Sequence, residues 1–495
     1  MREPVDWPTV DLLTHRAETT PERTALVDAD TGEQWPYLAY DAAVNGVAAG
    51  LDDLLDASGG RVATLLDTRP AVGHLLFGAM RVGATLAPLN VELDAGTLTH
   101  QLRTLDADLL VCEHATEPLA AEVADCPVVS VDEPTTAEAS SLDGERADPS
   151  AFDPVESREE TALVLFTSGT TSDPKGVRLT VGNLVASATA SAFRLGVVPG
   201  DRWLVCLPTY HMGGLAPLFR AVLYGTAAVV QRSFEPGATA DVLSEHDIAG
   251  VSLVPTMLTR LLDTGWEPAE SLRFVLLGGG PATPELIDRA TERGVPVCPT
   301  YGMTETASQI ATALPETARD YPGTVGQPLV STEVTVLADG APAGPGEQGE
   351  LVVDGPTVTP GYLDDAATDD AFGPAGFHTG DLGYRDADGR LWVVGRADDR
   401  IVTGGENVAA DAVADVIREC PGVTDAAVVG LPDEEWGQRV AALVVGDVDS
   451  GAVLTHCRRE LPRYEVPKTV GCTDELPRTA SGTVDRDAVR ELLRE

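Results

Sequence analysis

The chain has 495 residues and a formal net charge of −44, from 78 acidic and only 34 basic side chains. This length predicts two to four domains at about 150 residues per domain, and the charge argues against nucleic acid or anionic lipid as a partner, because a polyanionic surface repels both. No apolar run of about 18 residues and no secretion-signal pattern is present, so we expect a cytoplasmic protein without membrane insertion.

The lysine, acid and cysteine content indicates the environment of the protein and not its function. Lysine occurs only as Lys175 and Lys468, and an acid excess extends over the whole chain. This pattern is typical of adaptation to high salt, where screening weakens the repulsion between like charges. The seven cysteines are scattered, odd in number and without a CxxC pair, which favours buried reduced thiols over a metal site or a disulfide framework.

The first part of the chain predicts helices alternating with buried strands. Apolar residues recur at helical spacing over 40–54 and 71–82, and 62–66 is a short apolar run typical of a strand. Such alternation favours crossover units and largely parallel sheets. Residues 132–160, which are acidic and rich in Ser, Thr and Pro, predict a solvated connection before a second alternating region over 161–297.

The remaining chain predicts smaller architectures. Short strands between Gly and Pro turns over 322–394 indicate a small β-rich subdomain. Beyond Arg396, helices and strands form a compact α+β module of about 100 residues. The sequence therefore predicts an α/β protein. A large N-terminal domain, 1–396, would contain α/β layers and the β-rich subdomain, and a smaller α+β C-terminal domain would span 397–495.

A candidate phosphate-binding loop follows the apolar strand at 163–166. It reads Thr167-Ser168-Gly169-Thr170-Thr171 and continues to Lys175-Gly176. Glycine lets backbone N–H groups turn toward an anion, the hydroxyls add donors, and lysine supplies a point charge. The loop differs from that of P-loop NTPases, because glycine follows the lysine. A polar surface turn is an equal alternative from composition alone, but the position of one of only two lysines favours phosphate binding.

Four further blocks follow in order along the chain. They are Gly278-Gly279-Gly280-Pro281, Tyr301-Gly302-Met303-Thr304-Glu305, His378-Thr379-Gly380-Asp381 and Gly395-Arg396-Ala397-Asp398-Asp399-Arg400. Each block alone has a structural interpretation, such as a helix cap or a turn. Together with the loop they resemble the blocks of the adenylate-forming superfamily, which includes acyl-CoA synthetases, luciferases and peptide-synthetase adenylation domains. The resemblance covers nearly the whole chain.

The resemblance implies a site for ATP and Mg²⁺. Lys175 and the loop 167–171 would bind phosphate, Thr304 would contact the α-phosphate, and Glu305 would help to hold the metal. A point charge, a hydroxyl and a hard carboxylate suit these tasks. The other implied ATP contacts are Tyr301, Gly302, Gly279, Gly280 and Pro281 at the adenine, and Asp381 and Arg396 at the ribose or phosphate.

The C-terminal module is implied to be mobile and to serve the CoA step. Asp398 would be the hinge about which it rotates. Gly404, Gly405 and Glu406 resemble the family loop that approaches the pantetheine of CoA.

One position departs from the family pattern. Thr483 occupies the place of the usual catalytic lysine, and threonine cannot supply positive charge to the developing phosphate. Arg478 or Arg486 could substitute, high salt could reduce the need for the charge, or adenylation could be slow. We favour arginine substitution.

Substrate choice depends on a mostly apolar predicted helix within 207–225, which Arg220 interrupts. The residues alone favour a snorkelling arginine over a partner for a substrate carboxylate. This helix and segment 301–310 are similar to those of o-succinylbenzoate–CoA ligases of menaquinone biosynthesis, whose acid keeps one carboxylate while the other is activated. That resemblance reverses the preference and implies Arg220 and Ser308 as partners of the second carboxylate. His211 would line the pocket, or is equally a core histidine.

The sequence thus predicts an AMP-forming acid–CoA ligase. Its substrates would be small molecules: ATP, CoA and an acid, with o-succinylbenzoate favoured. The first alternative is a CoA ligase for another aryl or medium-chain acid. The second, supported by Thr483, is an adenylation-impaired protein that binds acyl-adenylates. A domain that loads a carrier protein ranks lowest.

Overall fold

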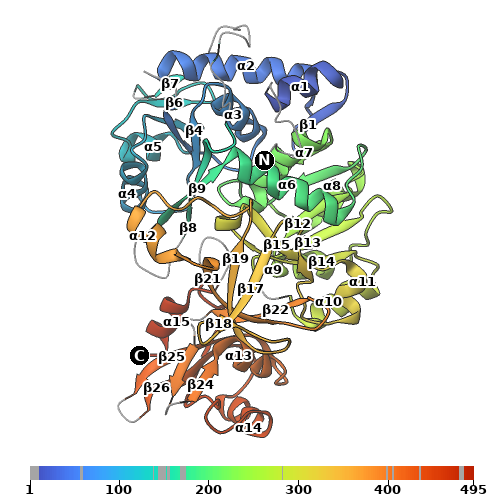
Figure 1. Ribbon diagram of the computed structural model, residues 1–495, viewed down its shortest axis with the longest axis vertical. Helices are drawn as coiled ribbons and strands as arrows, with labels where there is room; N and C mark the ends of the chain where they lie inside the picture. The colour runs from blue at the N-terminus through green and yellow to red at the C-terminus, as the bar shows by residue number, and fades with distance from the viewer. Residues whose placement is uncertain are drawn as a thin grey trace. The chain divides into compact units, whose positions relative to one another are not determined.

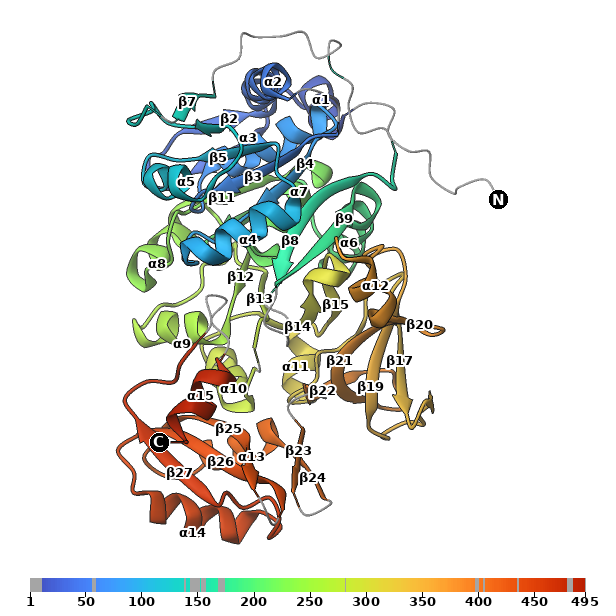
Figure 2. The same cartoon turned by 90° about the vertical axis from the view of Figure 1, so that its left-hand side faces the viewer.

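The computed structural model describes most of the chain, which divides into two compact units. The first comprises Met1–Glu333 and Val353–Phe377, and the second comprises Val334–Val352 and His378–Glu495. Figures 1 and 2 show the ribbon from two sides. The described residues are 11–55, 59–137, 139–142, 152, 157–167, 174–280, 282–396, 400–403, 406–433, 436–478 and 484–494.

A seven-stranded sheet forms one half of the first unit, with the strand order β7-β6-β5-β3-β4-β8-β9. Its pairs are parallel except for β8 and β9. Most side chains of the central strands are buried, as expected for short apolar runs in a sheet covered on both faces. The strands are β3 (Arg61–Leu65), β4 (Thr85–Pro88), β5 (Leu109–Cys112), β6 (Val128–Ser130), β7 (Ala139–Ser141), β8 (Thr161–Thr167) and β9 (Lys175–Thr180).

A nine-stranded sheet forms the other half, in the order β16-β15-β14-β13-β12-β10-β11-β1-β2. The strands from β14 to β1 in this order pair in parallel, and both ends of the sheet are antiparallel. The strands are β1 (Thr24–Asp28), β2 (Gln34–Pro36), β10 (Arg202–Val205), β11 (Ala227–Val230), β12 (Gly250–Leu253), β13 (Phe274–Leu277), β14 (Val297–Met303), β15 (Ser308–Thr312) and β16 (Gln327–Pro328).

Helices cover both faces of each sheet. One hydrophobic cluster joins apolar side chains of both sheets to α2, α3, α6 and α7, so these helices lie between the sheets. Two further clusters cover the outer faces, with α4 and α5 on the seven-stranded sheet and α8, α9 and α10 on the other. The helices are α1 (Leu12–Thr19), α2 (Tyr37–Leu54), α3 (Pro70–Arg81), α4 (Ala95–Leu105), α5 (Glu117–Val123), α6 (Val181–Leu195), α7 (Met212–Tyr224), α8 (Pro236–Glu245), α9 (Pro255–Asp263), α10 (Pro284–Glu292), α11 (Pro315–Asp320) and α12 (Asp365–Ala371).

The remaining elements form a β-rich part and an α+β part. Most of them belong to the second unit, but β20 and the ends of β17, β19 and β21 fall within the first. The six-stranded sheet has the order β18-β17-β19-β21-β20, with β22 also on β21, and the five-stranded sheet has the order β24-β23-β26-β25, with β27 on β26. The elements are β17 (Glu333–Ala338), β18 (Ala341–Pro342), β19 (Gly349–Asp354), β20 (Phe372–Gly373), β21 (Gly376–Arg385), β22 (Leu391–Arg396), β23 (Arg400–Thr403), β24 (Glu406–Ala409), α13 (Ala410–Arg418), β25 (Val423–Asp433), β26 (Gly437–Gly446), α14 (Ser450–Glu460), β27 (Thr469–Thr473) and α15 (Arg486–Leu492).

The predicted fold class is confirmed: α/β layers, a β-rich part and an α+β C-terminal part are all present. The helices predicted over 40–54 and 71–82 are α2 and α3. The solvated connection over 132–160 is only partly right, because β7 extends the parallel sheet beside β6. Its Ala-Ser-Ser sequence has no apolar signal. Within the described ranges, no helix has the length and apolar character needed to cross a lipid bilayer.

Candidate active site

Lys175 lies at the C-terminal end of the candidate phosphate loop. It begins β9 directly opposite Thr167, the last residue of β8, and the Thr167 hydroxyl donates to the Lys175 carbonyl over 3.5 Å. The antiparallel pair therefore fixes both ends of the loop. The loop residues Ser168, Gly169, Thr170 and Thr171 lie outside the described residues.

Strand β14, which carries Tyr301, ends in a tight turn that carries Thr304 and Glu305. A bulge separates Tyr301 from Gly302 in the antiparallel pairing with β15. A Cβ atom on Gly302 would lie only 1.8 Å from the carbonyl oxygen of Ser308, so a side chain would block this close approach of the two strands. The 3₁₀ turn Thr304–Thr306 follows at once.

The backbone turns sharply at Ser308, the first residue of β15. Ala307 and Ser308 have φ angles of 49° and 115°, and positive φ is uncommon for residues with a side chain. The Ser187 hydroxyl donates to the Ala307 carbonyl over 2.6 Å and helps to hold this conformation. Such strain clusters at functional sites, so Ser308 remains a candidate for substrate binding.

The glycine turn predicted to lie along adenine follows β13. Gly279 has a φ of 74°, a conformation that glycine adopts without steric cost, and Gly280 continues the turn. Strand β13 pairs in parallel with β14, so the turn and Tyr301 emerge at the same edge of the sheet. Ligands in α/β proteins bind at this carboxyl edge. Pro281 lies outside the described residues.

One residue that the sequence patterns did not indicate joins Lys175 to Glu305. The Tyr362 hydroxyl donates to Glu305 Oε1 over 3.0 Å, and the Lys175 ammonium lies 5.2 Å from the centre of the Tyr362 ring. Lys175 and Glu305, which both have predicted roles, therefore contact the same side chain. A tyrosine after Pro360-Gly361 has no motif signal of its own.

Arg220 is buried in the middle of α7. Its side chain is 3% exposed, and its Nη2 atom has no hydrogen-bond partner among the described residues. Burial lowers the pKa of Arg220, and nearby Tyr224 partly opposes this, but a guanidinium stays charged in proteins. The snorkelling interpretation is wrong, because the charged end does not reach solvent. A buried charged group with an unbonded nitrogen such as Nη2 is costly, so this position suits an anionic ligand.

His211 is the N-cap residue of α7 and packs edge-on against Tyr210, with ring centres 4.8 Å apart. Burial lowers its pKa, which favours the neutral ring. Its Nε2 atom has no hydrogen-bond partner in the described part of the chain, which argues against a satisfied core histidine. Helix α7 also contacts β15, the strand that begins with Ser308.

In the second unit, Asp381 and Arg396 face each other across β21 and β22. An Arg396 nitrogen lies 3.4 Å from an Asp381 carboxylate oxygen, and the Asp381 N–H donates to the Thr379 hydroxyl over 3.0 Å. Asp381 is buried, whereas the Arg396 side chain is 40% exposed. The pair is therefore accessible from the arginine side and enclosed on the aspartate side.

The two arginines considered as substitutes for the missing lysine are both in ion pairs. Arg478 lies 2.7 Å from Asp425, and Arg486 bonds to Asp411. Their charge is therefore partly compensated in this conformation. Outside the described residues lie Asp398, Gly404, Gly405 and Thr483, and Glu406 is described only as the first residue of β24.

The residues present fit a magnesium ion that is held mainly by substrate. No group of three or more His, Cys, Asp or Glu side chains in the described residues could hold a metal. Glu305 and the adjacent hydroxyl of Thr304 nevertheless provide hard oxygen donors. Mg²⁺ commonly binds through one or two carboxylates together with substrate phosphates, so this donor set is sufficient for Mg·ATP.

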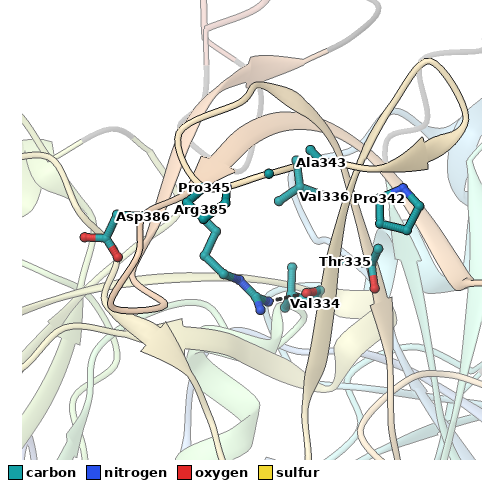
Figure 3. A pocket seen from close by; sticks show the side chains of 9 residues that line it. Val334, Thr335, Val336, Pro342, Ala343, Pro345, Arg385 and Asp386 are labelled. Carbon is teal, nitrogen blue, oxygen red and sulfur yellow. Dashed lines mark hydrogen bonds between the residues drawn. The ribbon is translucent and has the colours of Figure 1, made fainter.

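A cavity of about 270 Å³ lies elsewhere, in the β-rich part of the second unit. Figure 3 shows Arg385 turned toward Val334, whose carbonyl accepts a hydrogen bond from the guanidinium. Asp386 is paired with Arg390 at 2.7 Å. None of the predicted site residues lines this cavity, and its charged groups serve to hold the strands together.

Comparison with protein-family models gives two matches. Residues 13–363 match the AMP-binding enzyme family, and residues 412–483 match the AMP-binding enzyme C-terminal domain.

Several proteins are similar over nearly the full length. The 2-succinylbenzoate–CoA ligase of Bacillus velezensis is 38% identical over 97% of both chains, and that of Bacillus subtilis is 35% identical over 97% of both. Two solved structures of o-succinylbenzoate CoA synthetase (MenE) from Bacillus subtilis are 33% identical with a TM-score of 0.89. One holds the acyl-adenylate intermediate OSB-AMP, with 97% of this chain and 98% of that chain covered, and one holds ATP and a magnesium ion, with 98% and 99% covered.

Proposed function

Because the chain belongs to the AMP-binding enzyme family, we propose that it is an ATP-dependent acid–CoA ligase that converts o-succinylbenzoate to o-succinylbenzoyl-CoA through an acyl-adenylate. The reaction class is supported by one observation: Lys175 and Glu305 both contact the buried side chain of Tyr362. The observation that carries the acid is the buried guanidinium of Arg220, which suits the carboxylate that remains when the other one reacts. The product would serve menaquinone biosynthesis.

In the first half-reaction, the acid carboxylate attacks the α-phosphate of ATP, and pyrophosphate leaves. Lys175 and the loop 167–171 would balance phosphate charge, and Thr304 would donate to the α-phosphate. Bound Mg²⁺, held by Glu305 and the phosphates, would supply further charge neutralisation. The contribution of these residues is positioning and electrostatic stabilisation, because the protein forms no covalent bond to the substrate.

Further residues with predicted roles would contact the adenine and ribose of ATP. In the proposal, adenine lies beside Gly279-Gly280-Pro281 and Tyr301-Gly302, and Asp381 accepts from the ribose hydroxyls. Arg396 would leave Asp381 for the ribose or a phosphate. The exposure of Arg396 supports this exchange.

The acid would bind along α7 and the start of β15. Arg220 and Ser308 would hold the second carboxylate, and His211, kept neutral by burial, would lie near the carboxylate that reacts. Neutrality is useful at this point, because a protonated imidazole would hold the attacking oxygen by an ion pair and reduce its nucleophilicity.

In the second half-reaction, the CoA thiol attacks the acyl carbonyl and AMP leaves. We propose a domain boundary at 396/397, with rotation about Asp398 and with Gly404, Gly405 and Glu406 beside the pantetheine. Separate matches of the family models to 13–363 and 412–483 support two modules on either side of this hinge. The proposal also includes a cytoplasmic location and a high-salt habitat, the latter supported by the net charge of −44.

The test is acid-dependent ATP–pyrophosphate exchange without CoA, over a range of KCl concentrations. The acids would be o-succinylbenzoate, benzoate, cinnamate and a medium-chain fatty acid. Exchange with o-succinylbenzoate alone, followed by thioester formation when CoA is added, is the expected result. Exchange with a monocarboxylate instead would exclude the role proposed for Arg220.

A second candidate is a protein that binds acyl-adenylates but adenylates poorly. It is favoured by the replacement at Thr483 together with the ion pairs that engage Arg478 and Arg486. Binding of ATP without exchange for any acid in the panel would support it.

A further inference from the structure

A short segment, 359–363, is bonded to the strand that carries Lys175. The Leu363 N–H donates to the Gly176 carbonyl over 2.8 Å, and the Arg178 N–H donates to the Gly361 carbonyl over 3.0 Å. Val177 and Tyr362 form an antiparallel bridge between these bonds. The backbone at Tyr362 is therefore held directly beside the start of β9.

The same segment is bonded to the turn that carries Glu305. The Thr359 N–H donates to the Glu305 carbonyl over 2.7 Å, and the Thr359 hydroxyl donates to the Arg178 carbonyl over 2.5 Å. Strand β9 and this turn also contact each other directly, and Figure 2 shows β9 near β15, which follows the turn. Segment 359–363 thus joins two parts of the candidate site that are far apart along the chain.

The Tyr362 side chain contacts the carboxylate of Glu305 and the ammonium of Lys175. It is 4% exposed, its hydroxyl donates to Glu305 Oε1, and its ring lies under the Lys175 ammonium. The two contacts use different parts of the side chain: a phenol donor orients a carboxylate, and an aromatic face attracts a cation within about 6 Å.

We propose that Tyr362 is a positioning residue that sets the Mg²⁺ dependence of ATP binding through Glu305 and the phosphate contact through Lys175. This inference rests on the proposed function, in which these two residues bind metal and phosphate. The hydrogen bond to Oε1 constrains the orientation of the Glu305 carboxylate. Residues that hold a metal ligand in place typically change metal affinity about 10- to 100-fold when they are removed.

The hydroxyl and the ring can be separated by substitution. Tyr362→Phe removes the donor to Glu305 and keeps the ring under Lys175, whereas Tyr362→Leu removes both. Tyr384→Phe is the matched control. The ring of Tyr384 stacks on Trp392 in the second unit, so this substitution also removes one tyrosine hydroxyl but changes no contact of Lys175 or Glu305.

The experiment is calorimetric binding of a non-hydrolysable ATP analogue to the full chain, first in EDTA and then over a Mg²⁺ titration, with thermal unfolding of each variant. For Tyr362→Phe we expect metal-free binding within about twofold of the unmodified protein and a half-maximal Mg²⁺ concentration raised about tenfold. For Tyr362→Leu we expect weaker binding in EDTA as well. Tyr384→Phe should match the unmodified protein.

A Mg²⁺ response of Tyr362→Phe equal to that of Tyr384→Phe would overturn the inference, provided that Glu305→Gln shifts the response. Failure of the proposed function has a different signature, because then the unmodified protein binds no ATP analogue or shows no acid-dependent exchange. If Tyr362→Leu does not fold, Tyr362→Phe alone decides the matter.

Discussion

Four arginines considered for the candidate site, one in the first unit and three in the second, are held in two different ways. In the first unit, Arg220 is buried, and its Nη2 atom has no hydrogen-bond partner among the described residues. In the second unit, Arg396, Arg478 and Arg486 are partly exposed, and each lies within ion-pair distance of an aspartate.

This difference separates two kinds of site. Water reaches a partly exposed ion pair and screens its charges, so its partners exchange more easily than those of a fully buried pair. A buried charge without a partner destabilises the folded protein by several kcal/mol. Such a charge is therefore expected where a ligand of opposite charge binds to it. In the proposed function, the first unit would bind the acid at a buried cation, and the second unit would offer partly exposed ion pairs that can exchange partners during the reaction.

The largest effect is expected at Lys175, the cation of the first unit placed for phosphate. Lys175→Met should lower acid-dependent ATP–pyrophosphate exchange by about 100-fold or more, because a group that stabilises developing charge is lost. The chain offers one matched control: Lys468, the other lysine, lies 3.8 Å from the Trp436 ring in the second unit. Equal losses for Lys175→Met and Lys468→Met would contradict the contrast between the units.

Arg220 should show opposite effects on function and stability. Arg220→Leu should raise the KM for o-succinylbenzoate by about 100-fold, since truncating a buried charge contact costs about 2–5 kcal/mol. The same change should raise the free energy of unfolding by about 1 kcal/mol or more, because an unpaired buried charge is removed. Steady-state kinetics and chemical denaturation check the two effects. Retention of the substrate KM together with lower stability would show a structural role instead.

A buried histidine of the first unit allows the cost of burying an ionisable group to be tested by pH. His74 packs against the rings of Trp35 and Tyr40, with ring centres 5.6 and 5.1 Å apart. Burial lowers the pKa of His74 from 6.5 to about 4.

Because the folded-state pKa of His74 is depressed, the unfolded chain binds more protons between these two values. Stability is therefore unaffected by this group above about pH 6.5 and falls as the pH drops toward 4, by about 2 kcal/mol at pH 5. Chemical denaturation at pH 7.5 and pH 5 should show that the free energy of unfolding decreases less for His74→Phe than for the unmodified protein. The same substitution at exposed His100 should leave the loss unchanged, and an equal loss in all three proteins would refute the assignment.

The smallest effect is expected in the second unit, at Thr483. Thr483→Lys would restore the cation that the family pattern places there and should raise the exchange rate by about tenfold. Asp425→Asn, which releases Arg478 from its partner, should raise it by less. A larger gain from Asp425→Asn than from Thr483→Lys would mean that Arg478, once released, performs the function of the missing lysine.

Short-range patterns in the sequence were sufficient to predict much of the fold. Buried runs such as Val62–Leu65 and the spacing in α2 and α3 indicate their own structure, because they depend on periodicity within one element. The Gly279 turn and the Gly302 bulge are also local: each needs a residue without Cβ at one position. These features were predictable because neighbours along the chain determine them.

The tertiary structure alone decided which charged groups are buried and which side chains meet. Arg220 has the same helical spacing whether its guanidinium snorkels or is enclosed, and only the packing of α7 between two sheets buries it. Tyr362 carries no motif and lies 57 residues from Glu305, yet it contacts both Glu305 and Lys175. The physical reason is that residue spacing sets the direction of a side chain within its own element, whereas its solvent exposure and its partners depend on elements that fold against it from elsewhere in the chain.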